Sequence, residues 1–318
     1  MPHSKTLSGS LLLVLLACSS TEPPDSAPAG TEIVFQAGDS SSADIYVVNA
    51  DGSGLTRLTD PAHADFDPSW SGDGRQIYFI SSNRDGRTSS GLYAMNPDGT
   101  DVHLAVAYTY NSGGLPQAYA VSPDGTRIAL GSISPMQSPQ NVDLYVMNLD
   151  GSGQTRILDL PCQFVDMDCE QLNALAWSPD GQQIAYSARW PGHGGNVYGI
   201  IGIVNADGTG HQVLTTTEVR STDPAWAPDG QRIVFSSVKT GTIPTPGAMA
   251  LEVINADGTG RTALQVGGSS PSWSPDGQSI VFVQSGGLFA VNADGTGLRH
   301  VTDAPGGAHA PHWSPAEP

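Results

Sequence analysis

Positive charge is the scarcest feature of this sequence. The 318 residues contain 13 lysines and arginines against 31 aspartates and glutamates, which gives a formal net charge of -18 at pH 7. A strongly acidic surface repels the phosphate backbone of nucleic acids and the anionic headgroups of lipids. We therefore expect no nucleic-acid binding, whereas neutral and cationic partners remain open.

Long apolar runs and helical patterns are missing beyond the N-terminal end. After residue 17 no apolar segment approaches the ~20 residues that a helix needs to cross a bilayer. No later segment keeps the period of an amphipathic helix either. The motifs of a serine-hydrolase elbow, a zinc protease and a phosphate-binding loop are also absent. The sequence thus favours a strand-built binding protein over an enzyme.

Cysteine occurs three times, and the first copy marks an export signal. Lys5 precedes a mostly apolar stretch, residues 7–17, which has the length of a signal-peptide apolar region. The segment Leu15-Leu16-Ala17-Cys18 resembles the lipobox of bacterial lipoproteins. We therefore predict a lipoprotein signal peptide over residues 1–17 and a lipid on Cys18. A plain secretory signal with a chance cysteine is the alternative.

Residues 18–30 are expected to form a flexible tether, because a Ser- and Pro-rich stretch with almost no large apolar side chains cannot bury surface. Ser19 resembles the sorting residue of Gram-negative lipoproteins. We therefore predict an exported protein that is lipid-anchored on the outer membrane and faces the periplasm. In an oxidising compartment Cys162 and Cys169 are predicted to form a local disulfide. Metal binding by this pair is the alternative, and it requires further ligands.

Glycine and proline are abundant, with 38 and 24 copies spread between apolar runs, which indicates many turns. Two turn motifs repeat along the chain. Asn-x-Asp-Gly begins at Asn49, Asn96, Asn148, Asn205, Asn255 and Asn292. Trp-Ser-Pro-Asp-Gly or a close variant begins at Trp70, Val121, Trp177, Trp226 and Trp273, and a shortened copy begins at Trp313. Successive Asn-x-Asp-Gly copies lie 37 to 57 residues apart, which is typical of β-propellers.

Each repeat accounts for four strands. Ser-Pro-Asp-Gly is a turn because proline presets φ and glycine accepts positive φ. An alternating apolar run such as Ile77–Ile80 follows, and a second run such as Ile45–Val48 leads into Asn-x-Asp-Gly. The tryptophan segment is the first strand, and a short run after Asn-x-Asp-Gly is the fourth. We therefore predict an all-β, six-bladed β-propeller with four-stranded blades over residues 31–318.

The two ends of the chain are expected to complete one blade. Ile33-Val34-Phe35 matches the second strand of a repeat whose first strand is missing. Trp313-Ser314-Pro315 matches a first strand that has no second. Pairing of the C-terminal strand with the N-terminal strands would close the ring and remove exposed sheet edges. Because one chain completes the ring, a monomer is sufficient.

The combined pattern Pro-x-Trp-Ser-Pro-Asp-Gly, Ile-x-Phe and Leu-Tyr-Val-x-Asn-x-Asp-Gly resembles the WD-like repeat of the TolB β-propeller family over residues 31 to 315. The resemblance implies a role in the Tol–Pal system of the bacterial envelope. TolB is a soluble periplasmic protein with an α/β domain before its propeller, whereas the tether stands in that place here. We therefore expect a TolB-like lipoprotein that lacks the N-terminal domain.

The turns and the loops of such a propeller fall on opposite faces. The Asp-Gly turns are uniform, which indicates a structural role. The loops between second and third strands and between blades lie on the other face, called the loop face below. They vary in length and content, as binding loops on a rigid scaffold do. We expect the partner to bind at the loop face and the channel mouth, where the candidate residues are Asp65, Asp67, Asp223, Arg220, His309, His63, Trp190 and His193.

Each group of candidates has an alternative. The carboxylates can cap loop amides, as Asx-turns do. Trp190 can pack locally instead of stacking on a sugar or a peptide. Asp166, Asp168 and Glu170 form a candidate calcium site, although EF-hand spacing is absent. No other cofactor is expected, and the sequence leaves metal binding open.

Two functions follow. The first is an envelope-anchored scaffold that holds an envelope protein through the loop face and touches the membrane only through its lipid. The second is a glycan-binding protein or a metal-dependent enzyme that acts on polysaccharides at the channel mouth. The oligogalacturonate lyase group, which has similar WD-like repeats, holds its metal in the channel with histidines and a glutamine. Only His63, His309 and His312 are expected near the channel here. The first function is therefore favoured.

Overall fold

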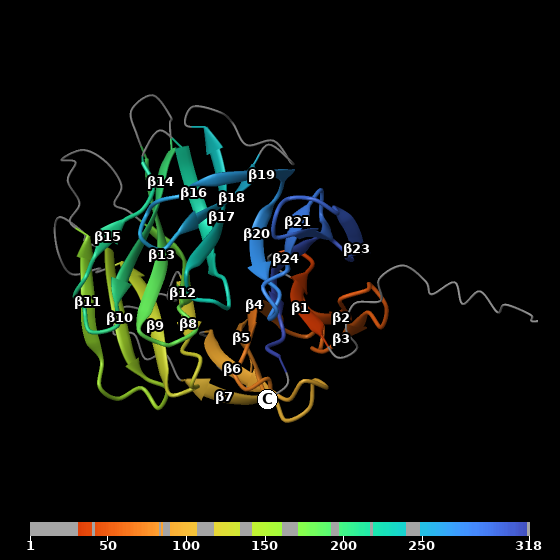
Figure 1. Ribbon diagram of the computed structural model, residues 1–318. Coiled ribbons are helices and arrows are strands. Elements are labelled where there is room, and N and C mark those ends of the chain that lie inside the picture. The colour runs from red at the N-terminus through yellow and green to blue at the C-terminus, as the bar shows by residue number, and fades with distance from the viewer. Residues whose placement is uncertain are drawn as a thin grey trace, which may run out of the picture.

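The computed structural model describes residues 31–39, 42–82, 84, 90–106, 118–133, 142–160, 171–191, 197–216, 219–239 and 249–316. Within these ranges 24 strands form six four-stranded antiparallel sheets. The sheets stand as blades around a central axis (Figure 1). No helix in this described part of the chain is long and apolar enough to cross a membrane. The predicted all-β, six-bladed propeller is confirmed.

The blades are numbered here in chain order, starting with the blade that holds both ends of the described chain. Blade 1 contains β24 (Ala308–Trp313), β1 (Glu32–Ala37), β2 (Asp44–Asn49) and β3 (Thr56–Arg57). Blade 2 contains β4 (Ala64–Trp70), β5 (Ile77–Ser82), β6 (Gly91–Met95) and β7 (His103–Val106). Blade 3 contains β8 (Ala118–Val121), β9 (Arg127–Ile133), β10 (Val142–Asn148) and β11 (Thr155–Leu160).

The second half of the ring repeats this order. Blade 4 contains β12 (Gln171–Trp177), β13 (Gln183–Pro191), β14 (Val197–Asn205) and β15 (Gln212–Val213). Blade 5 contains β16 (Val219–Trp226), β17 (Arg232–Lys239), β18 (Ala250–Asn255) and β19 (Thr262–Gly267). Blade 6 contains β20 (Ser269–Trp273), β21 (Ser279–Gln284), β22 (Gly287–Asn292) and β23 (Arg299–Asp303). The first strand of each blade lies innermost, and the fourth lies at the periphery.

Blade 1 closes the ring as the sequence predicts. β24 pairs antiparallel with β1, with Ile33 opposite Trp313. Two further hydrogen bonds extend the pairing: the Ser314 amide donates to the Glu32 carbonyl at 2.7 Å, and the Glu32 amide donates to Ser314 Oγ at 2.9 Å. The strand from the far end of the chain thus covers an edge that β1 would otherwise expose.

The two Asp-Gly turns are rigid for a common reason. In the first, Asp73 Oδ1 accepts hydrogen bonds from Ser71 Oγ at 2.7 Å and from the Arg75 amide at 3.1 Å. In the second, Asp51 Oδ1 accepts from the amide and the hydroxyl of Ser53 at 2.8 and 2.7 Å. These donors lower the pKa of both carboxyls, so the turns carry negative charge at neutral pH. The structure thus agrees with the structural role expected for these turns.

The hydrophobic core is divided among the contacts between neighbouring blades. Each of six buried clusters joins two consecutive blades, so that every blade depends on both neighbours. The repeated tryptophans help to connect them: Trp177 Nε1 donates to the Ala120 carbonyl of blade 3 at 2.9 Å, and Trp226 Nε1 donates to the Ala176 carbonyl of blade 4 at 3.1 Å. Blade 3 has Val121 at the tryptophan position.

Candidate functional site

A bend in the inner strands shapes the centre of the ring. The register of β4 against β5 shifts between Phe66 and Ser69, and that of β16 against β17 shifts between Thr222 and Ala225. At these β-bulges, three positions before the tryptophan, a non-glycine residue adopts positive φ. The four such residues are Asp67 at 48°, Asp223 at 54°, Ser270 at 51° and Ala310 at 44°. This conformation costs about 1–3 kcal/mol per residue and tends to gather at functional sites.

The bulges border a central channel. Its cavity has a volume of about 590 Å³, and inner-strand residues of all six blades line it. Towards the turn face the lining consists of turn residues, namely Gly72, Pro123, Pro179, Pro228, Pro275 and Pro315. Glycine replaces proline in blade 2 because a Cβ at Gly72 would lie 2.0 Å from the Pro123 carbonyl oxygen. The turn-face end of the channel is therefore lined mainly by proline rings, which cannot rotate into the lumen.

Two carboxylates stand on opposite sides of this channel. Asp67 belongs to blade 2 and Asp223 to blade 5, three blades further around the ring. Asp67 is open to the channel, yet the protein surrounds it and replaces most of the bulk solvent. This enclosure raises the pKa of Asp67, the charge of Asp223 raises it further, and His309 lowers it. The charge of Asp223 therefore reaches Asp67 across the lumen.

Asp223 is held more firmly than Asp67. Enclosure raises the pKa of Asp223, while a hydrogen bond from the Thr222 hydroxyl, at 3.0 Å, opposes the shift. The Ser270 amide and the charge of Arg220 oppose it as well. Arg220 is itself half-buried, and burial together with the charge of Arg189 lowers its pKa. Asp223 is thus positioned by two side chains of its own strand and by the backbone of the next blade.

His312 contributes no positive charge to the channel at neutral pH. It lies one position before Trp313, faces the lumen, and accepts a hydrogen bond at Nδ1 from the Trp70 amide at 3.4 Å. The surrounding protein disfavours the imidazolium and lowers the pKa of His312 to about 4. The ring is therefore neutral under physiological conditions. The lining carries two acids without a permanent cation among the residues described.

The structure places Asp65 away from the channel. Its carboxylate is fully buried in blade 2, and Arg84 Nη2 lies 3.0 Å from Asp65 Oδ2. The Arg84 guanidinium also stacks over the rings of Phe79 and Tyr93, at 5.7 and 5.6 Å from their centroids. Asp65 thus forms an internal ion pair, and its carboxylate is not presented at the channel mouth.

The other predicted site residues are only partly brought together. His309 on β24 is exposed and close enough to act on Asp67, and Arg220 acts on Asp223. His63 is half-buried before β4 and does not belong to the described channel lining. The backbone of Trp190 belongs to β13, and its side chain is outside the description. The remaining predicted residues lie outside the described ranges, namely Cys18, Cys162, Cys169, His193, Asp166, Asp168 and Glu170.

Several lining residues were not singled out from the sequence. Ser270 and Ala310 occupy the same bulge position as Asp67 and Asp223, directly before a proline. Counting back three positions from each repeat tryptophan would have identified them. Tyr119 has no such signal, because β8 pairs with β9 without a bulge. Its hydroxyl donates to the Asp67 carbonyl of the neighbouring blade, which places it beside the acidic position.

The pattern of the repeats and the geometry of the ring agree with a family comparison. The model of the TolB beta propeller domain matches residues 105–317. The chain belongs to the TolB β-propeller family. This confirms the resemblance inferred from the repeat.

Individual relatives of this TolB-family propeller show how far the likeness extends. A protein of Agrobacterium fabrum described as uncharacterized is 29% identical over 150 residues, which is 46% of this chain and 48% of that one. The crystal structure of TolB from Acinetobacter baumannii superposes with a TM-score of 0.66 at 17% identity, over 89% of this chain and 66% of TolB. The chain thus spans about half of the first relative and just under two thirds of the second, and the structural likeness shows the fold.

An oligogalacturonate lyase in complex with manganese shares the fold more distantly. It superposes with a TM-score of 0.55 at 16% identity, over 86% of this chain and 74% of the lyase. Among the described residues no three histidine, cysteine, aspartate or glutamate side chains come together to hold a metal. Asp67 and Asp223 stand on opposite blades, and His312 points one nitrogen at a backbone amide. The described channel of this TolB-family propeller therefore does not fit a metal centre of that kind.

Asparagine at both channel acids is expected to raise the melting temperature at pH 7 by a few degrees. Enclosure raises the pKa of folded Asp67 and Asp223 above the unfolded value of about 3.9. Their charges therefore destabilise the fold at neutral pH, and the wild type regains this stability as the pH falls through the folded pKa values. The difference between variant and wild type should vanish below about pH 4, as followed by circular dichroism.

The matched control, Asp207→Asn, is expected to change the melting temperature in the opposite direction. Asp207 Oδ1 accepts hydrogen bonds from the amide and hydroxyl of Thr209 at 2.9 and 2.7 Å, and these donors lower its pKa. Asp207→Asn should therefore lower the melting temperature at neutral pH, and the loss should fade in acid. A double channel variant that is less stable than the wild type at pH 7 would mean that the hydrogen bonds and charges around the two acids outweigh the effect of their enclosure.

Proposed function

We propose that this protein is an exported, lipid-anchored propeller scaffold that holds an envelope protein partner at its loop face and channel. The observation that carries the proposal is the pair of opposed, strained acids in the channel. Asp67 and Asp223 keep left-handed backbone and raised pKa values at the centre of the ring, a combination that costs stability. Retention of such a costly arrangement is typical of binding sites.

The chemistry of the channel favours a cationic segment of the partner. Two carboxylates face a lumen whose histidine, His312, is neutral at physiological pH. A lysine or arginine side chain that enters the channel would pair with them in an enclosed environment, where charge-assisted hydrogen bonds are strong. The cavity of about 590 Å³ has room for several side chains of an extended segment.

The anchor part of the proposal rests on the sequence. Cys18 follows the signal-peptide pattern, and the Ser- and Pro-rich composition of residues 18–30 predicts a tether that would let the propeller reach a partner near the membrane. A lipid on Cys18 with Ser19 beside it supports an outer-membrane position on the periplasmic side. Membrane contact through the propeller itself is disfavoured by the net charge of -18.

Crosslinking in cells tests both parts in one experiment. Three proteins are compared by crosslinking, affinity purification and membrane fractionation: the wild type, Asp67→Asn with Asp223→Asn, and Cys18→Ser. We expect the wild type to retain one specific envelope protein and the double channel variant to lose at least ~90% of it, because the pairing charges are gone. Cys18→Ser should move from the membrane fraction to the soluble fraction.

Asp65 is kept in these variants because its substitution would disturb the fold. Asp207→Asn serves as the control, since it removes one carboxylate charge from the turn face and leaves the channel intact. Equal capture by the double channel variant and the wild type would refute the channel as the binding site. Retention of Cys18→Ser in the membrane fraction would refute the lipid anchor and leave the channel result unaffected.

A further inference from the structure

The contact between blades 2 and 3 differs from the other five contacts between neighbouring blades. Elsewhere the glycine of each Asn-x-Asp-Gly turn lies against the preceding blade. A Cβ added there would lie 2.2 Å from Val301 O at Gly52, 2.8 Å from Leu58 O at Gly99, 3.1 Å from Ile157 O at Gly208, 3.2 Å from Gln212 Nε2 at Gly258 and 2.5 Å from Leu264 O at Gly295. At Gly151, in blade 3, no described atom lies within 4 Å of that position apart from those of Gly151 and its two chain neighbours.

One substitution in the repeat accompanies this opening. The outer-strand residue at the position that faces the turn is large in five blades, namely Leu58, Ile157, Leu214, Leu264 and Val301. In blade 2 the same position is Ala105 on β7. The turn of blade 3 has Leu149 where the others have alanine or proline, but Leu149 remains only half-buried. Ala105 and Leu149 therefore both pack against the cluster between blades 2 and 3 while they stay only partly buried.

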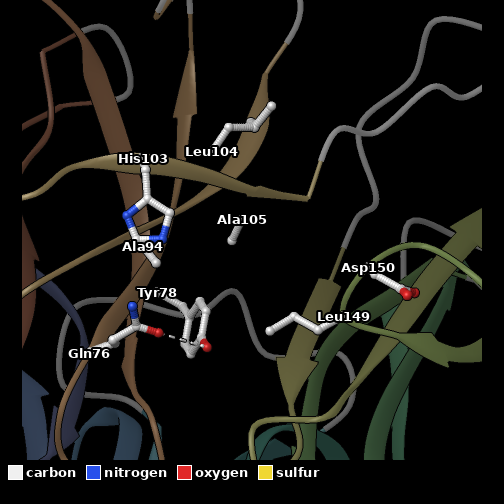
Figure 2. Close-up of a pocket in the computed structure, with 8 residues that line it drawn as sticks. All are labelled: Gln76, Tyr78, Ala94, His103, Leu104, Ala105, Leu149 and Asp150. Atoms are coloured by element: carbon white, nitrogen blue, oxygen red, sulfur yellow. Dashed lines mark hydrogen bonds between the residues drawn. The ribbon is translucent and has the colours of Figure 1, made fainter.

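The result is a groove on the outer wall of the ring with a volume of about 290 Å³. Figure 2 shows Leu149 and Asp150 on one side of it, and Tyr78, His103 and Leu104 on the other. The Tyr78 hydroxyl donates a hydrogen bond to Gln76 Oε1 at 3.2 Å, and because Tyr78 is only 4% exposed it forms part of the floor and presents little of its ring. Most of the floor is apolar, whereas the rim is polar.

Asp150 is the one acidic residue among the described residues that line the groove. Asp150 is exposed, and its Oδ1 accepts hydrogen bonds from the amide and hydroxyl of Ser152 at 2.9 and 2.6 Å, which fixes its position. Asp73 is close enough to act electrostatically on Tyr78, and Arg75 offsets it in part at 3.9 Å. An apolar floor below an acidic rim is complementary to an apolar side chain that is accompanied by a cation.

We propose that this groove between β7 and the Asn148–Gly151 turn is a docking site for a protein segment with a large aliphatic or aromatic side chain next to lysine or arginine. The volume supports one such side chain, since a cavity of about 150 Å³ holds benzene. The site lies on the outer wall and is separate from the channel lining. It therefore adds a second contact to the scaffold and does not depend on the proposed function of the channel.

The decisive variant is Ala105→Leu, which introduces the residue that blades 1, 4 and 5 have at this position, namely Leu58, Leu214 and Leu264. It fills the groove without a charge change, and we expect the variant to remain folded with an unchanged or higher melting temperature. A second variant, Asp150→Asn, removes the rim charge and keeps the oxygen that accepts the turn hydrogen bonds. Asp294→Asn is the matched control in the corresponding turn of blade 6, where Gly295 is closed against Leu264.

The probes are three acetylated and amidated pentapeptides: Gly-Lys-Phe-Lys-Gly, Gly-Glu-Phe-Glu-Gly and Gly-Lys-Ser-Lys-Gly. Each is titrated into the full-length protein while the methyl NMR signals of Leu104 and Leu149 are followed, with Leu288 as a buried reference. We expect the first peptide alone to shift the two groove signals. Its Kd should weaken at least ~10-fold in Ala105→Leu and about 3-fold in Asp150→Asn, with Asp294→Asn unchanged.

Three results would overturn the proposal. The first is a Kd for Gly-Lys-Phe-Lys-Gly that is the same in a folded Ala105→Leu protein. The second is equal binding of the glutamate peptide, which would remove the role of the acidic rim. The third is dissociation of a wild-type dimer by Ala105→Leu in sedimentation, which would make a second copy the occupant. Asp67→Asn with Asp223→Asn should leave these titrations unchanged, so failure here is distinguishable from failure of the channel proposal.

Discussion

Removal of residues 308–318 is expected to abolish cooperative folding. β24 supplies the inner strand of blade 1, and Trp313 and Ala308 lie within the cluster between blades 6 and 1. Without the strand, β1 becomes an exposed edge and the ring opens. The loss should exceed the total stability of about 5–15 kcal/mol that single domains have. Urea denaturation followed by tryptophan fluorescence should show no sigmoidal transition, and the protein should aggregate through the free edge.

A milder change measures the same contact. Trp313 is 5% exposed, so Trp313→Ala should lower the free energy of unfolding by about 3–5 kcal/mol. Leu298 is 49% exposed, and Leu298→Ala should change it by less than about 0.5 kcal/mol. If the chain without residues 308–318 had the same urea denaturation midpoint as the wild type, the ring would not need its closing strand.

The second large effect is expected for Asp65→Ala. The substitution leaves the guanidinium of Arg84, whose side chain is 12% exposed, without its carboxylate. Removing one partner of a buried ion pair typically costs about 3–5 kcal/mol, because the remaining charge stays buried and unpaired. The measurement is the urea midpoint at constant m-value, which separates a change in stability from a change in the denatured state.

Two further variants show whether the loss of stability in Asp65→Ala comes from the buried, unpaired charge. Asp159→Ala breaks an ion pair with Arg156 in which both side chains are more than 40% exposed, and it should cost less than about 1 kcal/mol. In a double-mutant cycle Arg84→Met should recover part of the loss in the Asp65→Ala background, since no buried charge remains. A cost for Asp65→Ala no larger than that of Asp159→Ala would show that the buried pair does not stabilise blade 2.

The fold was predictable because one local pattern recurs. Each Asn-x-Asp-Gly and Ser-Pro-Asp-Gly copy favours the same turn through its aspartate and glycine, and the alternating runs between them favour strands. The incomplete repeats at Ile33–Phe35 and Trp313–Pro315 predicted the closure, since neither is stable alone. Repetition thus turned weak local preferences into a specific architecture.

The candidate site was predictable only in part, because position in a repeat does not reveal the direction of a side chain. Asp65 and Asp67 are two residues apart on β4, and both were expected at the channel mouth. The β-bulge after Phe66 directs Asp67 into the lumen, while Asp65 faces Arg84 inside the blade. The sequence carries no sign that Arg84, from the next connection, supplies the partner. Similarly, the groove beside Ala105 of blade 2 depends on how closely the Asn148–Gly151 turn of blade 3 approaches it, and the sequence does not reveal that distance.

The closing strand also has a consequence for the order in which the protein can fold during synthesis. The pairing of Ile33 with Trp313 joins residues from the two ends of the described chain, so blade 1 stays incomplete until the last blade has emerged from the ribosome. Until then β1 to β3 present a free edge that can pair with other chains. Contacts at such sequence separation also slow folding. In a nascent chain of this protein β1 therefore lacks its inner partner strand until residues 308–313 have been synthesised.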